Sequence, residues 1–328
     1  MRAFEYAHPN TKEEVVQLLS SEWGETEILA GGTDLISLMK DEVATPKRLV
    51  SLKHVKGLKG IEFKSATGLR IGAMTTFEDV LDNGDIRHHY AGIVQAVEGV
   101  TSPQIRSVGT VGGDLLQRPR CWYFRGGFGL LAERDGKSLV PGGDNRYHAI
   151  LGNSGPAYFV NPSSLAPILI ALGAKVRVQG PQGPREIELD KFFVTPTSAQ
   201  EREYTLKPNE LLTEILVPPA DGARSAVYEV RQKEALDWPL AAAAVVLHLD
   251  GHTVKSARVV LGHVAPVPWP SPEAEQALAG KVVNEESAVE AGKVALAKAT
   301  PLSRNAYKVQ LARVAVKRAI LRAAKGEA

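Results

Sequence analysis

The chain has 328 residues, a mass of 35.3 kDa, 44% hydrophobic and 23% charged residues. Subtracting 37 Asp and Glu from 39 Lys and Arg gives a net charge of +2, which argues against a dedicated nucleic-acid-binding protein. The ordinary composition excludes a disordered or fibrous chain. The single cysteine, Cys121, excludes an internal disulfide and any metal site built from several thiolates.

The length predicts about two domains, or three small ones. No stretch approaches the ~18 uninterrupted apolar residues of a membrane-spanning helix. The first residues, MRAFEYAHPNTKEE, become polar and acidic too early for the apolar core of a secretory signal. We therefore expect a cytoplasmic protein, with a periplasmic location open through co-export with a partner.

The first part of the chain predicts one helix and two strands. A capping box at 11–14 opens a short amphipathic helix. Strands are expected at 27–30 and 48–52, and the first of them runs directly into a glycine-rich turn. A Lys- and Gly-rich crossover at 56–60 marks the first expected boundary.

The middle of the chain predicts a strand at 69–73 and a helix opened by a second capping box, Thr75 to Glu78. Residues 102–115 are the most glycine-punctuated run. The irregular run at 118–145 is long enough to be functional or inserted. The further expected elements are an apolar strand opened by His148 at 148–152, a buried helix at 164–172 and a strand at 174–178.

The last part of the chain, from residue 222, predicts a hairpin followed by helices. The hairpin strands are 241–249 and 253–261, and the helices lie at about 272–279, 286–299 and 301–325. From Arg304 onward there are seven basic residues and one acidic residue, which gives 7 − 1 = +6. This basic helix fits either a solvated face or a docking surface for an acidic partner subunit.

Two glycine-rich turns are the strongest chemical signal. Residues 30–35 read A-G-G-T-D-L, and residues 108–115 read V-G-T-V-G-G-D-L. Paired glycines let backbone N–H groups approach an anion without a Cβ atom in the way, so the two turns could hold both phosphates of a dinucleotide. Either turn alone is more often an ordinary tight turn, and only the pair makes the two interpretations equally good. Neither is a G-x-G-x-x-G fingerprint, and no Walker A motif occurs.

Other chemical candidates lie in the irregular run. Cys121 stands beside Arg118, Arg120 and Arg125, and is either a low-pKa thiol or a half-buried inert one. His148 is expected to be structural. The aromatic residues 122–124 are expected to cover a pocket or a partner surface.

These motifs together resemble the FAD-binding (medium) subunit of the xanthine dehydrogenase and molybdenum hydroxylase family. The resemblance rests on the two glycine-rich turns, I-G-A-M-T-T at 71–76 and V-A-P-V-P-W at 264–269, and it spans essentially the whole chain. The runs at 117–124 and 148–152 are most similar to the branch of periplasmic aldehyde oxidoreductases.

The resemblance implies an α+β fold in three parts. A two-lobed FAD-binding fold of the PCMH, or vanillyl-alcohol-oxidase-like, type would comprise subdomains 1–57 and 58–221. A CO-dehydrogenase-flavoprotein-like domain with a small antiparallel sheet and helices would follow at 222–328.

The resemblance also implies that the two turns bind the FAD diphosphate and that the chain has no substrate-oxidising residue. The residues expected to bind FAD are Leu29, Ala30, Gly31, Gly32, Thr33, Asp34, Leu35, Thr75, Thr101, Ile105, Gly109, Thr110, Gly112, Gly113, Asp114, Ile150 and Lys233. The implied partners are a large molybdopterin subunit, which would oxidise an aldehyde or N-heterocycle, and a small subunit with [2Fe–2S] clusters. Electrons would reach FAD and then NAD, oxygen, a quinone or a ferredoxin-like protein.

Some positions depart from the family pattern. Relatives can carry a [4Fe–4S] cluster in the loop at 121–147, but Cys121 is the only thiol here, so we predict a metal-free loop. Asp114 replaces the usual Asn and would repel a phosphate, so we expect it to accept hydrogen bonds from backbone N–H groups or from the ribose.

Ser164 and Glu229 replace a common Asp and a common Lys, which leaves Arg231 and Lys233 as the nearby cations. Two other functions stay open from the sequence: a stand-alone flavin oxidase of the same fold, and an assembly subunit that no longer binds flavin.

Overall fold

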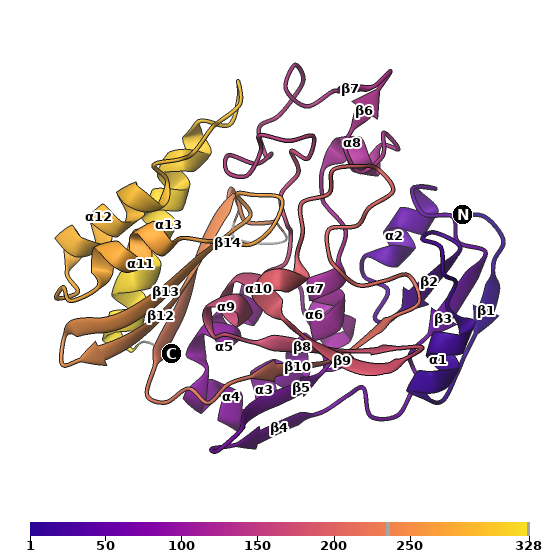
Figure 1. The fold of residues 1–328 in the computed structure, drawn as a ribbon, viewed down its shortest axis with the longest axis horizontal. Helices are drawn as coiled ribbons and strands as arrows, with labels where there is room; N and C mark the ends of the chain where they lie inside the picture. The colour runs from indigo at the N-terminus through magenta and orange to yellow at the C-terminus, as the bar shows by residue number, and fades with distance from the viewer. Residues whose placement is uncertain (234–236, 327–328) are drawn as a thin grey trace.

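The computed structural model describes residues 1–233 and 237–326, which form three lobes with an irregular loop projecting from them (Figure 1). Glu327, which is counted in the net charge of the last helix, lies outside the described residues. Each lobe is built on its own sheet, of three, five and four strands in chain order. No helix within the described ranges is both long and apolar enough to cross a bilayer.

The first lobe, at the N-terminal end in Figure 1, contains a parallel sheet in the order β1-β3-β2. The predicted capping box is confirmed, because Thr11 Oγ1 accepts from the Glu14 amide at 3.1 Å and the Glu14 carboxylate accepts from the Thr11 amide at 3.3 Å. The elements are β1 (Glu5–Ala7), α1 (Lys12–Leu18), β2 (Thr26–Leu29), α2 (Leu35–Lys40) and β3 (Arg48–Ser51).

The second lobe has an antiparallel sheet in the order β4-β5-β10-β8-β9, with helices packed against it. Its strands are β4 (Ile61–Lys64), β5 (Gly68–Gly72), β8 (Lys175–Gly180), β9 (Gly183–Glu188) and β10 (Leu211–Val217). Its helices are α3 (Phe77–Asp82), α4 (Gly84–His89), α5 (Ala91–Glu98), α6 (Pro103–Val108), α7 (Val111–Leu116), α9 (Ala166–Ala171) and α10 (Leu189–Phe192).

The capping box predicted from Thr75 is wrong by one residue. Thr76 caps α3, and its hydroxyl accepts from the Asp79 amide at 3.2 Å. The Thr75 hydroxyl is engaged elsewhere, since it lies 3.1 Å from both the carbonyl oxygen and the amide nitrogen of Gly60.

The loop after α7 contains only α8 (Trp122–Arg125), β6 (Glu133–Arg134) and β7 (Lys137–Ser138). The strand predicted at 148–152 is wrong. The amides of Ile150 and Leu151 both donate to the Val264 carbonyl, at 2.8 and 3.1 Å, so this segment makes no strand ladder. It is nevertheless apolar because both side chains are buried in the core of the third lobe.

The third lobe consists of an antiparallel sheet covered on one face by three helices (Figure 1). Its elements are β11 (Arg224–Val230), β12 (Ala241–Asp250), β13 (Thr253–Gly262), β14 (Trp269–Pro270), α11 (Pro272–Leu278), α12 (Glu285–Ala295) and α13 (Tyr307–Lys325). The predicted hairpin is confirmed as β12 and β13.

Strand β12 is apolar on both faces because both faces are covered. Ala243 and Val245 pack in the cluster with α13, whereas Ala244 and Val246 pack in the core of the second lobe. A strand buried on both faces is expected to be continuously apolar. The third lobe is therefore fixed to the second through this sheet.

Helix α13 begins at Tyr307 rather than at residue 301, because Asn305 Oδ1 accepts from the Leu302 amide at 2.6 Å and holds a turn before it. Lys308, counted above among the basic residues, is buried, and its ammonium group donates to the carbonyls of Tyr147, His148 and His263 at 2.9–3.2 Å. The docking surface on this helix stays a prediction.

Candidate functional site

The two glycine-rich turns lie against each other where the first lobe meets the second. A Cβ atom on Gly31 would overlap the carbonyl oxygen of Val108, at the end of α6. Gly32 has φ +76°, a conformation that favours glycine. The first turn therefore crosses the second at a distance that only a glycine allows.

The second turn opens helix α7. Thr110 is its N-cap, and the Thr110 hydroxyl accepts from the Gly113 amide at 3.1 Å. The amides of Val111 and Gly112 donate to the carbonyls of Thr75 and Ala73, both at 2.9 Å. These two amides are therefore not available to phosphate oxygens, in contrast to the expectation for the second turn.

Two cavities flank the crossing. The Thr101 cavity has a volume of about 220 Å³ and lies toward the third lobe, since Arg231 and Trp238 line it. The Trp23 cavity has a volume of about 170 Å³ and lies toward the first lobe. Five residues line both cavities, namely Thr33, Asp34, Thr110, Gly113 and Gln117.

Most of the predicted FAD-binding residues come together here. The Thr101 cavity is lined by Thr33, Asp34, Thr101, Ile105, Gly109, Thr110, Gly113 and Asp114. The Trp23 cavity adds Ala30, Gly31, Gly32, Leu35 and Gly112. Leu29 packs against the first turn, since a Cβ atom on Gly32 would lie 3.4 Å from Leu29 Cδ1.

Besides Leu29, three predicted residues do not line either cavity. Thr75 is fully buried against Gly60, and Ile150 is fully buried in the third lobe. Lys233 is exposed and lines a different cavity.

Asp34 joins the first turn to the irregular loop. Its Oδ2 atom accepts from the Arg118 amide at 2.8 Å, while Oδ1 lies 2.7 Å from Arg125 Nη2 and 3.0 Å from Arg120 Nη1. Its charge is thus balanced by two guanidinium groups, which it holds beside the turn.

Arg120 was not predicted to bind FAD, and from the sequence it was noted only as a neighbour of Cys121. Its guanidinium lines the Thr101 cavity and lies 4.3 Å from the centre of the Trp238 ring. Burial lowers the pKa of Arg120 to about 10, so it stays a cation at neutral pH. Its Nε atom is buried without a hydrogen-bond partner in the described structure, which leaves one donor for a ligand.

Asp114 satisfies its carboxylate within the protein. It accepts from the Ser163 hydroxyl and from the amides of Ser164 and Leu165, at 3.3 and 3.0 Å. Burial raises the pKa of Asp114, and these hydrogen bonds oppose the rise. The predicted acceptance from backbone N–H groups is confirmed, and Asp114 ties α7 to the start of α9.

Glu229 is also neutralised within the protein. Its carboxylate pairs with Arg231 and lies over Gly99, where any Cβ atom would overlap a carboxylate oxygen. Burial raises the pKa of Glu229. Arg231 lines the Thr101 cavity and thus supplies a cation there.

The Trp23 cavity has an aromatic wall that the sequence did not signal. The rings of Trp23 and Tyr204 meet edge to face with centroids 6.0 Å apart. The guanidinium of Arg202 lies 4.8 Å from the centre of the Trp23 ring. Tyr204 is distant in sequence from the first lobe, so only the folded chain brings these rings together.

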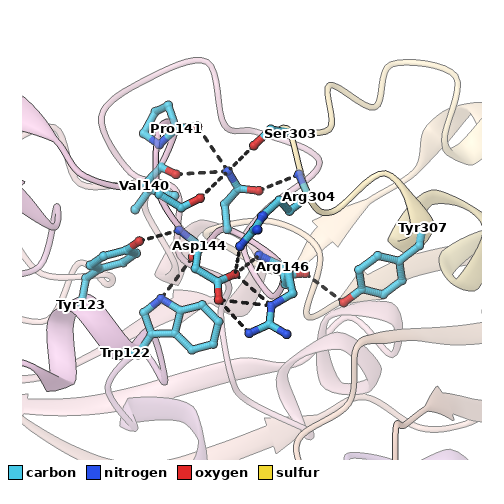
Figure 2. A network of polar contacts seen from close by, with 11 residues as sticks. Trp122, Tyr123, Val140, Pro141, Asp144, Arg146, Ser303, Arg304 and Tyr307 are labelled. Carbon is cyan, nitrogen blue, oxygen red and sulfur yellow. Dashed lines mark hydrogen bonds and ion pairs between the residues drawn. The ribbon is translucent and has the colours of Figure 1, made fainter.

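Polar contacts tie the far end of the irregular loop to the start of α13 (Figure 2). Asn145 donates to the Val140 carbonyl at 3.2 Å and to the Ser303 hydroxyl at 3.0 Å, and it accepts from the Arg304 amide at 2.9 Å. The Tyr307 hydroxyl donates to the Arg146 carbonyl at 2.9 Å.

A small apolar cluster holds the part of the irregular loop that contains Cys121. Its buried members are Leu130, Leu131, Ala157 and Phe159, and Cys121 packs against them. Burial raises the pKa of the Cys121 thiol, and its neighbour His148, 3.2 Å away, has a pKa lowered to about 4 by burial. A neutral imidazole does not acidify a thiol, so the inert reading of Cys121 is favoured.

Comparison with known proteins decides the family. Residues 2–220, more than half of the chain, match the family described as the FAD-binding domain in molybdopterin dehydrogenase. The chain belongs to this family. Residues 226–323 match the CO dehydrogenase flavoprotein C-terminal domain, so the predicted family and fold are both confirmed.

Relatives of this flavoprotein family cover nearly the whole chain. It is 32% identical to the aldehyde oxidoreductase FAD-binding subunit PaoB of Escherichia coli (strain K12), over 95% of this chain and 96% of the relative. It is 29% identical to the carbon monoxide dehydrogenase medium chain of Hydrogenophaga pseudoflava, over 97% and 96%.

A solved structure of carbon monoxide dehydrogenase from Hydrogenophaga pseudoflava has a TM-score of 0.78 at 29% identity, over 100% of this chain and 99% of that chain. The protein is therefore an FAD-binding oxidoreductase subunit of this family.

Proposed function

We propose that the chain binds one FAD with its diphosphate at the crossing of the two glycine-rich turns and its two ends in the Thr101 and Trp23 cavities. The observation that carries this proposal is the pair of cavities sharing Thr33, Asp34, Thr110 and Gly113 as a common wall. An extended dinucleotide needs such a continuous site, which neither turn offers alone.

The residues of the site fit FAD chemically. Arg120 and Arg231 supply positive charge to the Thr101 cavity, and Arg120 keeps an unused buried donor for an oxygen of the ligand. Trp23 and Tyr204 supply an aromatic wall to the other cavity, which suits the adenine ring. Asp34 orients Arg120.

When bound, FAD supplies electron transfer, and this chain positions it and excludes water around it. We assign no catalytic residue to the chain. Thr75 and Ile150 are buried and contribute to the packing of the protein instead of contacting FAD. Lys233 lies outside the two FAD cavities.

The partners we propose are a large molybdopterin subunit that oxidises the substrate, a small subunit with [2Fe–2S] clusters, and an external electron acceptor. Support comes from the relatives, several of which are named as medium chains or subunits. The proposed units are residues 1–57, 58–221 and 222–328, and each contains one of the three main sheets. The proposed location is the cytoplasm, or the periplasm through co-export with a partner.

The flavin-free alternative rested on Asp114, Ser164 and Glu229. Asp114 is satisfied by hydroxyl and amide donors, and Glu229 is paired with Arg231. Donors hold the Asp114 carboxylate and a cation lies beside the Glu229 carboxylate, so this alternative loses its main support.

The substitution Gly113→Val tests the proposal. A Cβ atom on Gly113 meets only the Thr110 hydroxyl, at 2.9 Å, so the valine would project into the shared wall without overlapping backbone. The matched control is Gly142→Ala, at an exposed glycine with nothing within 4 Å of its Cβ position.

We expect the wild-type chain and the control to carry FAD in an absorbance spectrum, and Gly113→Val to lose it while keeping the wild-type circular dichroism spectrum. A colourless wild-type chain after FAD addition, or FAD binding by Gly113→Val with unchanged affinity, would refute the site.

A further inference from the structure

A third cavity lies beside the Thr101 cavity, on the side of the irregular loop. This Cys121 cavity has a volume of about 410 Å³, within the range of small-molecule sites. Thr33, Thr110 and Gly113, which form the crossing of the two turns, do not line it, so it is separate from the proposed diphosphate site. Two exposed residues, Lys233 and Trp238, line it, so the cavity reaches the surface.

A buried cation lies in the wall of this cavity. Lys308 is 1% exposed, and its ammonium group uses all three of its donors on the carbonyls of Tyr147, His148 and His263. Burial lowers the pKa of Lys308 to about 7, and no carboxylate among the described residues opposes this shift. Lys308 is also the second residue of α13, where the helix dipole is positive. A negatively charged ligand in the cavity would therefore stabilise this buried charge.

The charges of the lining favour a ligand with a single negative charge. Besides Lys308, the described lining contains two cations, Lys233 and Arg120, and one acidic residue, Asp237. Arg120 is left out of the balance, because Asp34 pairs with it and its free Nε atom is assigned to FAD. The two lysines against Asp237 give 2 − 1 = +1.

Two buried histidines supply hydrogen-bond donors close to Lys308. His148 Nδ1 and His263 Nε2 lack a hydrogen-bond partner in the described structure, and both residues line the cavity. Burial lowers the pKa of His148 to about 4 and that of His263 to about 3, so both rings are neutral and each has one N–H group. The Cys121 thiol lies 3.2 Å from His148 Nε2 and can donate to it, which leaves the N–H group of His148 on Nδ1. The two oxygens of a carboxylate match these two donors.

The rest of the wall is largely aromatic. Trp122, Tyr147, Phe159 and Trp238 line the cavity, and aromatic side chains pack well against a further ring. A carboxylate alone would leave these rings facing water, whereas a carboxylate on a ring would cover them. The lining therefore favours an aromatic acid over a small inorganic anion.

We propose that the Cys121 cavity binds a small aromatic carboxylate, with the carboxylate between His148 and His263 and the ring between the aromatic side chains. Lys308 stabilises the carboxylate by its charge and not by a hydrogen bond, because its three donors are already used. Lys233, at the surface, attracts the anion to the opening.

The test is isothermal titration calorimetry of the full chain with benzoate at about pH 6, below the lowered pKa of Lys308. Lys308→Met would leave three carbonyls without a donor, so the charge is tested on the ligand instead, with benzamide as the neutral analogue and acetate as the anion without a ring. Val160→Phe fills the cavity from its wall, and Val194→Phe is the matched control at an exposed valine outside the cavity. Lys233→Gln removes the charge at the opening, and Lys281→Gln is its control at an exposed lysine elsewhere.

We expect saturable binding of benzoate to the wild type, with an affinity about tenfold or more above that for benzamide or acetate. Val160→Phe loses about tenfold or more in affinity for benzoate, and Lys233→Gln loses about threefold. Val194→Phe and Lys281→Gln keep the wild-type affinity.

Each contrary result overturns the proposal at a different point. Equal affinity for benzamide removes the role of the charge, and equal affinity for acetate removes the role of the rings. Unchanged affinity in Val160→Phe places any benzoate site elsewhere, and a lack of saturable binding removes the site altogether. Val160 lines neither FAD cavity, so these outcomes are separate from the success or failure of FAD binding.

Discussion

The two glycine-rich turns look alike in the sequence but are held in different ways. In the first turn, Gly31 lies against the backbone of Val108 and Gly32 has a positive φ, so the protein's own packing requires glycine. In the second turn, Gly109 and Gly112 are also closely packed, and only Gly113 would meet no atom other than the Thr110 hydroxyl. The glycines of the first turn thus serve the fold, whereas Gly113 is the glycine that the proposed FAD site requires.

The largest expected effect is that of Gly31→Ala. The new methyl group would overlap a backbone carbonyl that cannot rotate away, so we expect a loss of about 3 kcal/mol in the free energy of unfolding. Urea unfolding measures it, with Gly142→Ala as the control expected to stay within about 0.5 kcal/mol. Equal stability of the two variants would show that the crossing of the turns is not tight.

Asp34→Asn tests how the first turn is anchored to the loop. It removes charge-assisted contacts to Arg120 and Arg125, so we expect a loss of about 2 kcal/mol in stability. FAD affinity should fall as well, because Arg120 loses its orientation. Unchanged urea unfolding together with unchanged FAD affinity would contradict the anchoring role.

Asp114→Asn tests the second turn through pH. Burial raises the pKa of Asp114 in the folded chain above its ordinary 3.8, so the unfolded chain releases this proton at a lower pH. By linkage, the contribution of Asp114 to the free energy of unfolding of the wild type therefore falls as pH rises from about 4 through the raised pKa.

The Asn variant lacks this loss. We expect the free energy of unfolding of Asp114→Asn, measured in urea, to rise relative to that of the wild type between pH 4 and pH 7, because only the wild type has a buried carboxyl group that ionises in this range. A wild type that gains on the variant as pH rises would have the opposite sign and would exclude a raised pKa.

The smallest effect is expected for Cys121→Ser in the loop that Asp34 anchors. The thiol packs against an apolar cluster and lies beside a neutral His148. We expect FAD content to be unchanged and iron to be absent in both chains by metal analysis. Iron that is present in the wild type and lost in Cys121→Ser would overturn the metal-free prediction.

Much of this architecture could be predicted from the sequence because its local signals are strong. Thr11 capped its helix as expected, and the strongly apolar run before Gly251 predicted the long hairpin. The two glycine motifs indicated a dinucleotide site, which stays a prediction. Their contact depends on the packing of α6 against the first turn, which no spacing in the sequence encodes.

Other predictions from the sequence were wrong, and each has a physical reason. Residues 148–152 are apolar like a strand, but they owe this to burial in the third lobe. Lys308 looked like part of a solvated face, yet three carbonyls bind its ammonium group inside the protein. Arg120 was hidden as a site residue because Asp34, its partner, lies in another lobe.

The most direct test of the central claim is a crystal structure of the chain with FAD. We predict electron density for the diphosphate in contact with both Thr33 and Thr110, with one end of the molecule in each flanking cavity. A diphosphate bound away from the crossing of the two turns would contradict it.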